Sequence, residues 1–251
     1  ICERIQAKEC SAAAYYYLGE ISLREDDIAK ATELLERSWN LFEKVSPQLF
    51  AKYRPHLLLA RGATSLRNGK AEDSLIYLRE LASIVSDLAG MAKTQTYIGD
   101  AFRDLKKRQE AIDNYKSALD LFHRALVATP NDISLRSWEI AVLNHLASIS
   151  YEYGDFSSSI AYNRKILELQ KGRNETINSV QTLINMHMIA AANKRSDDAF
   201  AYLNEALALS GNNRNLEAYV LGFAISTNQA EGNSAEVLKL AKKILPIKQE
   251  Q

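Results

Sequence analysis

The stretch from Thr96 to Leu121, TYIGDAFRDLKKRQEAIDNYKSALDL, constrains the fold of this chain more than any other. Its second half carries residues at four- and three-residue steps, at Ala111, Tyr115 and Ala118. This spacing places all three on one face of a helix. Its first half carries a glycine beside a bulky residue, at Ile98 and Gly99, and the four residues 106–109 separate the halves. The order of small and large residues predicts two amphipathic helices that pack very closely as a hairpin.

The same pattern recurs along the whole chain. When the copies are aligned on Gly99, the equivalent residues are Gly19, Gly62, Gly99, Ala147, His187 and Ile225. The second helix of each copy repeats the four- and three-residue steps, as in Ala31, Leu35 and Ser38 or in Ser159, Asn163 and Ile166. We expect six hairpins, at about 12–46, 55–88, 92–128, 132–171, 175–210 and 215–247. Pro47 is expected to end the first hairpin and Pro55 to begin the next, because proline is tolerated only in the first turn of a helix.

These hairpins resemble tetratricopeptide repeats (TPRs), with the copies around Gly99 and Gly154 closest to the pattern. The resemblance implies an all-α fold, a right-handed α-solenoid of antiparallel helix hairpins that forms one superhelical domain over 1–251. Such hairpins bury their apolar faces only against stacked neighbours. The low content of 10 Gly and 4 Pro agrees with long helices. The copies are longer than the 34-residue period of the family, so some helices or loops must be extended.

The overall charge excludes some classes of partner. Lys plus Arg equals Asp plus Glu, at 31 each, which argues against a general nucleic-acid binder. No apolar run approaches the length of a membrane span, so we expect no membrane insertion by this stretch. The chain starts at Ile1 inside a helical pattern, and we therefore interpret it as a fragment of a longer protein. A cytoplasmic location is slightly favoured, with an extracytoplasmic sensor domain as the alternative.

Motifs for catalysis or for cofactors are not found in the sequence. There is no glycine-rich phosphate loop, no His-Glu-x-x-His pair and no Gly-x-Ser-x-Gly elbow. His145 and His187 occupy comparable parts of successive first helices, but packed histidines are favoured over a metal site there. We therefore expect no catalytic residue, no metal and no cofactor. A hydrolase would need a buried acid–base pair that the sequence does not reveal.

The resemblance also implies where a ligand would bind, because the first helix of each repeat lines the concave groove in such proteins. The candidate groove residues are Tyr16, Tyr17, Arg103, Asn144, His145, Tyr151, Asn185 and Met188. A clamp for a peptide carboxylate is rejected, since the positions in question hold Tyr16, Glu20 and Ala60, and Glu20 would repel a carboxylate. The asparagines favour another chemistry. An Asn amide offers the donor and the acceptor that a peptide backbone needs, and Asn144 and Asn185 should be neighbours, with Tyr151, Ile184 and Met188 as the apolar floor.

The sequence thus predicts a non-enzymatic TPR interaction domain that binds a protein or peptide segment. It would serve as the scaffold or ligand-sensing part of a larger regulatory protein. The alternative is a structural module for self-association, without a peptide ligand. The apolar residues Ile244, Leu245 and Ile247 suggest that the C-terminal end of the array is covered by further sequence or by another subunit.

Overall fold

The computed structural model describes residues 2–45, 47–211, 213–230, 232–233 and 236–242, with side chains from residue 7 onward. The helices are α1 (Cys2–Arg24), α2 (Ile28–Val45), α3 (Pro47–Arg67), α4 (Ala71–Ile84), α5 (Leu88–Asp104), α6 (Arg108–Ala128), α7 (Ile133–Glu152), α8 (Phe156–Gly172), α9 (Thr176–Ala192), α10 (Ser196–Ser210) and α11 (Arg214–Ala230). Residues 236–242 are helical as well, and no strand occurs in these ranges. The predicted all-α fold is confirmed. The predicted role of Ile244, Leu245 and Ile247 lies outside the described residues.

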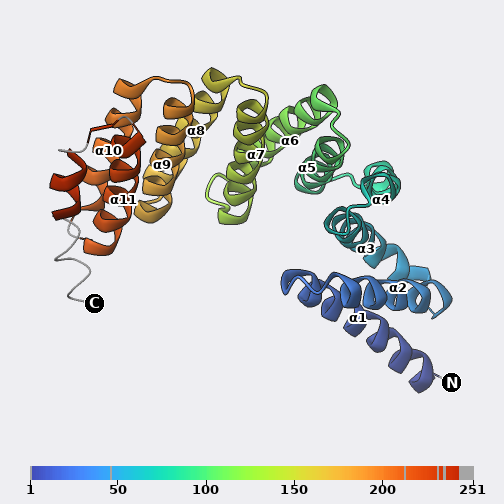
Figure 1. Cartoon of the computed structure of the whole chain (residues 1–251). Helices are drawn as coiled ribbons and strands as arrows, with labels where there is room; N and C mark the ends of the chain where they lie inside the picture. Colours follow the sequence, from blue (N-terminus) through green and yellow to red (C-terminus); the bar gives the residue numbers. More distant parts are fainter. Residues whose placement is uncertain (1, 46, 212, 231, 234–235, 243–251) are drawn as a thin grey trace. The chain divides into compact units, whose positions relative to one another are not determined.

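The chain forms two compact units, 1–142 and 143–251, and the boundary falls within α7. In the first unit α1 packs on α2, α3 on α4 and α5 on α6, and in the second α9 packs on α10 (Figure 1). First helices also contact each other, α1 with α3, α3 with α5 and α9 with α11. This pattern of contacts is that of stacked helix hairpins. The expectation of one continuous superhelix over 1–251 stays a prediction.

Glycines set the closest approach of the helices in the first three hairpins. A Cβ atom added to Gly99 would lie 2.6 Å from the ring of Tyr115, and one added to Gly62 would lie 2.8 Å from Leu78. Gly19 stands in the same relation to Leu35, at 2.9 Å. The side chains opposite these glycines are fully buried. Gly19, Gly62 and Gly99 therefore lie where the two helices of their hairpins touch.

Each hairpin turns through one residue with positive φ. These residues are Asp26, Gly69, Lys106, Gly154, Lys194 and Gly232, with φ between 57° and 75°. Each lies seven residues after the aligned position of its copy, so the turn has one geometry throughout. Only glycine adopts this left-handed conformation without steric cost. The repeated turn shows that the six copies share one register, although three of them lack the glycine that would reveal it.

Two predicted boundaries are wrong. Helix α3 begins at Pro47 and contains Pro55, whereas the sequence analysis placed its start near Pro55. The two additional turns are stabilised by packing, because Phe50 and Tyr53 pack against Trp39 and Phe42 of α2, with ring centroids 4.9 and 4.5 Å apart. The break predicted at 106–109 comprises residues 105–107 instead, since the helix resumes at Arg108, two residues after the left-handed Lys106.

Candidate functional site

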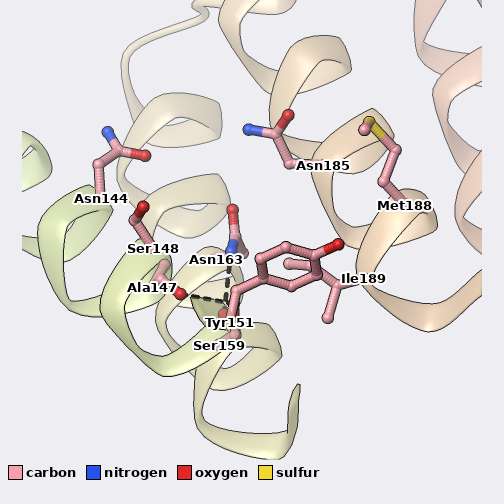
Figure 2. A pocket seen from close by; sticks show the side chains of 9 residues that line it. All are labelled: Asn144, Ala147, Ser148, Tyr151, Ser159, Asn163, Asn185, Met188 and Ile189. Atoms are coloured by element: carbon pink, nitrogen blue, oxygen red, sulfur yellow. Dashed lines mark hydrogen bonds between the residues drawn. The ribbon is translucent and has the colours of Figure 1, made fainter. Parts of the chain in front are cut away.

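A cavity of about 340 Å³ lies in the second unit, among α7, α8 and α9 (Figure 2). We call it the asparagine cavity. Its lining residues are Asn144, Ala147, Ser148, Tyr151, Ser159, Asn163, Asn185, Met188 and Ile189. None of these nine residues carries a charge. The structure thus brings together four of the predicted groove residues, Asn144, Tyr151, Asn185 and Met188. That they bind a ligand stays a prediction.

The residue pair at the floor of the asparagine cavity differs from the pair in the third hairpin. In the third hairpin the ring of Tyr115 packs on Gly99, and its hydroxyl donates to Asp100 Oδ1 over 2.7 Å. In the fourth hairpin the equivalent residues are Ala147 and Asn163. Because Asn163 is much smaller than tyrosine, the space that the ring would occupy remains open.

Local hydrogen bonds hold the floor of the asparagine cavity in place. Ser159 Oγ donates to the Ala147 carbonyl over 2.8 Å and so links α8 to α7. Asn163 Nδ2 donates to the Ser159 carbonyl over 2.9 Å. Both side chains are buried, with only 3% of Asn163 exposed. The nitrogen of Asn163 is thereby turned toward α8, and its oxygen points toward the space between Asn144 and Asn185 (Figure 2).

A chain of hydrogen bonds orients Asn185 at the rim. Tyr219 on α11 donates through its hydroxyl to Gln181 Oε1 over 2.6 Å. Gln181 Nε2 in turn donates to Asn185 Oδ1 over 3.2 Å. The amide nitrogen of Asn185 is left on the side that faces Asn144 (Figure 2). Asn185 therefore presents a donor to the asparagine cavity. This relay depends on the contact between α9 and α11.

The apolar part of the rim is exposed. Met188 is 51% exposed and Tyr151 is 43% exposed, although the Tyr151 ring also meets Phe156 edge-on at 5.7 Å. Ile184, predicted for the floor, is instead fully buried in the core formed with Leu203 and Val220. That position of α9 faces α10 and α11 rather than α7. Ile189 contributes to the lining of the asparagine cavity in its place.

The predicted histidines are not in the asparagine cavity. His145 is half-buried and does not line it. His187 is buried: its Nδ1 donates to the Ala199 carbonyl over 3.1 Å, and its Nε2 accepts from Thr227 Oγ1 over 2.9 Å. Burial lowers the pKa of His187, so its neutral form is favoured. Both ring nitrogens are engaged, and the described residues contain no group of three or more His, Cys, Asp or Glu able to hold a metal ion.

Tyr16 and Tyr17 belong to an aromatic cluster in the first unit. The Tyr16 ring meets Tyr17 at 5.1 Å and Tyr53 at 5.7 Å, both edge-on. Burial, with a contribution from the Glu20 charge, raises the pKa of Tyr16 to about 12. Burial also raises the pKa of Glu20. Unlike the asparagine cavity, this cluster therefore has a charged side chain, Glu20, beside its aromatic rings.

Arg103, the remaining predicted residue, is half-buried near the end of α5. A hollow of about 340 Å³ between first helices of this unit is lined by Leu23, Ala63, Leu66, Arg67, Tyr97, Asp100 and Asp104. Tyr16, Tyr17 and Arg103 are not among its lining residues. The role of these three residues in binding stays a prediction.

The sequence analysis missed a buried carboxylate in the first unit. Glu139 on α7 is 3% exposed and lies 2.7 Å from His123 Nε2 and 2.8 Å from Arg136 Nη1, one partner on each oxygen. With both oxygens engaged by cationic or hydrogen-bonding partners, Glu139 joins α6 to α7. No motif marks this group, because its partners come from two helices.

The comparisons with known proteins concern the fold. Neither a protein-family model nor a curated protein sequence matches the chain. Among solved structures, a signal-transduction ATPase with a tetratricopeptide repeat sensor from Pyrococcus horikoshii is 13% identical, with a TM-score of 0.69 over 95% of this chain and 37% of that one. The apo form of RapI is 8% identical, with a TM-score of 0.63 over 95% and 97% of the two chains. A Rap protein in complex with competence and sporulation factor is 11% identical, with a TM-score of 0.61 over 96% and 75%.

These likenesses, together with the repeated hairpins, establish the class of fold. The chain has the TPR-like fold, a helical solenoid of antiparallel hairpins. No helix in the part of the chain that the structure describes is long and apolar enough to cross a bilayer.

Proposed function

We propose that this chain is a non-enzymatic, protein-binding TPR domain whose asparagine cavity holds an extended peptide segment. The observation that carries the proposal is the pair of amides, Asn144 on α7 and Asn185 on α9, at the rim of one uncharged cavity. A backbone peptide unit has one N–H donor and one C=O acceptor. Asn185 offers its nitrogen to a ligand carbonyl, and Asn144 can accept from a ligand N–H. Such contacts do not depend on the ligand's side chains.

The exposed side chains beside these amides supply the apolar contacts. Met188 and Tyr151 together offer a flexible thioether and an aromatic ring. Burying such surface contributes roughly 25 cal/mol per Å², and methionine adapts to side chains of different shape. Ordering a flexible peptide offsets much of this gain. We therefore expect modest affinity, with Asn144 and Asn185 fixing the backbone and the apolar rim selecting a side chain.

We further propose that this domain is the ligand-sensing part or the scaffold of a larger regulatory protein. One protein of similar fold carries a TPR sensor, and another is complexed with competence and sporulation factor. These relationships support a ligand-binding use of the fold, while the residues of the asparagine cavity support a peptide as the ligand. The uncharged lining disfavours nucleic acid, whose recognition depends on Lys and Arg.

Binding to a library of N-acetylated, C-amidated hexapeptides tests the proposal. Enrichment on the parent chain should be followed by titration of the best peptide. Replacing both Asn144 and Asn185 with Ala should weaken binding about tenfold or more, since each hydrogen bond contributes about 0.5–1.5 kcal/mol. A matched control replaces Asn178 and Asn204, two exposed amides outside the cavity, and should bind like the parent. Equal affinity of the two double variants would contradict the assignment.

One observation favours self-association as a second candidate function. Helix α1 exposes Tyr17, Leu18 and Ile21, each about half accessible, on neighbouring positions of its surface. Adjacent exposed apolar side chains are typical of interfaces. If this surface pairs with a second copy, sedimentation should show a dimer that dissociates when Leu18 and Ile21 are replaced with Glu. A monomeric parent at high concentration would exclude this candidate.

A further inference from the structure

The buried amide of Asn163 has an acceptor without a donor. Its Nδ2 is engaged by the Ser159 carbonyl, which fixes the orientation of the amide because a carbonyl only accepts. Within the described part of the chain, no donor contacts Asn163 Oδ1. The oxygen points into the asparagine cavity, toward the space between Asn144 and Asn185 (Figure 2). In the described residues the fully buried polar side-chain atoms without a partner are Ser74 Oγ and Ser179 Oγ, so Asn163 Oδ1 is open to water from the cavity. A ligand side chain that displaces this water must supply a donor in its place.

Asn228 provides an internal comparison. It is equally buried, at 3% exposed, and its Nδ2 donates in the same way to the carbonyl four residues earlier, that of Ala224, over 2.8 Å. Its Oδ1, however, accepts from Asn233 Nδ2 over 3.2 Å. The protein thus completes the hydrogen bonds of one such asparagine internally and leaves the other open toward a cavity.

In other hairpins the position equivalent to Asn163 holds an apolar or aromatic residue. The equivalent residues in other hairpins are Leu35, Leu78, Tyr115 and Leu203, all buried. A leucine at position 163 would satisfy the packing of the hairpin but would remove the acceptor from the floor of the asparagine cavity. The asparagine instead places one acceptor at the floor of the cavity.

We propose that Asn163 selects the ligand side chain that enters the asparagine cavity. The inserted side chain is neutral and ends in an O–H or N–H donor, as in Ser, Thr, Tyr, Asn or Gln. This inference rests on the proposed peptide-binding function and adds its specificity. A hydrocarbon side chain would displace water from Asn163 Oδ1 without replacing its hydrogen bond.

Charged side chains are excluded for two reasons. A carboxylate would place its oxygens against the Asn163 acceptor, with like partial charges facing each other. An ammonium group could donate, but the lining contains no carboxylate to compensate for its loss of hydration. The cavity therefore discriminates both by the direction of one hydrogen bond and by the absence of charge among its lining residues.

Isosteric pairs of side chains test the inference on the unmodified protein. The probes are N-acetylated, C-amidated tetrapeptide pools in which one position is fixed as Thr or Val, Tyr or Phe, Gln or Glu. At one position we expect the Thr and Tyr pools to bind about tenfold more tightly than the Val and Phe pools, and the Glu pool to bind least. Equal binding of the Thr and Val pools, and of the Tyr and Phe pools, at every position would overturn the inference and leave the proposed function intact. If no pool binds at all, both fail.

Variants at Asn163 and Asn228 separate selection from folding. Asn163→Leu should keep or raise the melting temperature, because leucine occupies the equivalent position in three hairpins, and it should remove the preference for Thr over Val and for Tyr over Phe. Asn228→Leu changes an equally buried asparagine outside the asparagine cavity and should leave the preference for Thr over Val unchanged. A folded Asn163→Leu protein that still preferred Thr over Val would contradict the assignment. If that variant does not fold, binding of the isosteric peptide pools to the parent protein still tests the inference.

Discussion

The hydroxyl of Tyr219 donates to Gln181 Oε1 over 2.6 Å, and this contact between α11 and α9 fixes the amide that reaches Asn185. The ligand-facing donor of Asn185 is thus oriented by a residue that does not line the asparagine cavity. Because a hydrogen bond that is already oriented costs less ordering on binding, the relay should affect affinity.

We expect Tyr219→Phe and Gln181→Ala each to weaken binding of the best library peptide about two- to tenfold, from the loss of one hydrogen bond of about 0.5–1.5 kcal/mol. Both residues lie at the surface, so the melting temperature should change little. Titration calorimetry on the two variants provides the measurement. The double variant should bind no worse than Gln181→Ala alone, because Tyr219 acts through Gln181. An additive loss would show that Tyr219 contacts the peptide directly.

Gly99→Ala should destabilise the first unit by about 1–3 kcal/mol, as overpacked helix contacts do. The added Cβ would lie 2.6 Å from the ring of Tyr115, which is fully buried and hydrogen-bonded to Asp100 and so has little room to move. Urea unfolding monitored by tryptophan fluorescence reports on this unit, since both tryptophans, Trp39 and Trp138, lie in it.

The matched control for Gly99 is Gly222→Ala on α11. No atom lies within 4 Å of a Cβ added there, so only the better helix propensity of alanine remains, and stability should rise by up to about 1 kcal/mol. Hydrogen exchange of α11 gives the readout in the second unit. If Gly99→Ala were also stabilising, the close contact with Tyr115 would be disproved.

Lys194→Gly should stabilise the turn between α9 and α10. Lys194 has a φ of 57°, in the region that costs a residue with a side chain roughly 1–2 kcal/mol. Glycine removes this cost, although it also gains freedom in the unfolded chain, so we expect a net gain of up to about 1 kcal/mol. Denaturant unfolding followed by circular dichroism measures the change. Glycine already occupies the equivalent position in the fourth hairpin, at Gly154, where replacement with Ala should be destabilising.

The stability of the second unit should fall as the pH drops below about 6.5. Burial lowers the pKa of His187, so the unfolded chain takes up a proton at this position before the folded chain does. The stabilisation that neutral His187 provides is therefore complete above its pKa in the unfolded chain. It is lost as the pH falls toward the lower pKa of His187 in the folded chain. His187→Gln removes the titrating group, so the slope of stability with pH should flatten. Unchanged slopes from pH 7.5 to 5 would contradict this reading.

The first unit should lose stability at high pH. The pKa of Tyr16 is raised from 10.0 to about 12, so the folded chain retains a proton that the unfolded chain releases. The contribution of protonated Tyr16 to the free energy of unfolding is fully present below pH 10 and is lost as the pH rises through about 12. Tyr16→Phe should show a smaller decrease over this range in urea unfolding followed by tryptophan fluorescence. A parallel decrease in parent and variant would show that Tyr16 titrates like a solvated phenol.

The sequence by itself determined the fold, because its information is local. The steps between Ala111, Tyr115 and Ala118, and the glycine opposite Tyr115, depend only on helix geometry and on the closeness that a missing side chain permits. The same argument placed Asn144 and Asn185 on adjacent first helices, and in the structure they share one cavity. That they bind a ligand is still to be tested.

Only the tertiary structure decided the features that depend on partners from other helices. Helix α3 continues through Pro55 because Phe50 and Tyr53 find aromatic neighbours on α2. Ile184 is buried because α10 and α11 cover its side of α9. Most clearly, Asn163 in the sequence is one more residue at a packing position. Its oxygen faces the asparagine cavity because the Ser159 carbonyl engages its nitrogen, a contact that the residue pattern alone does not reveal.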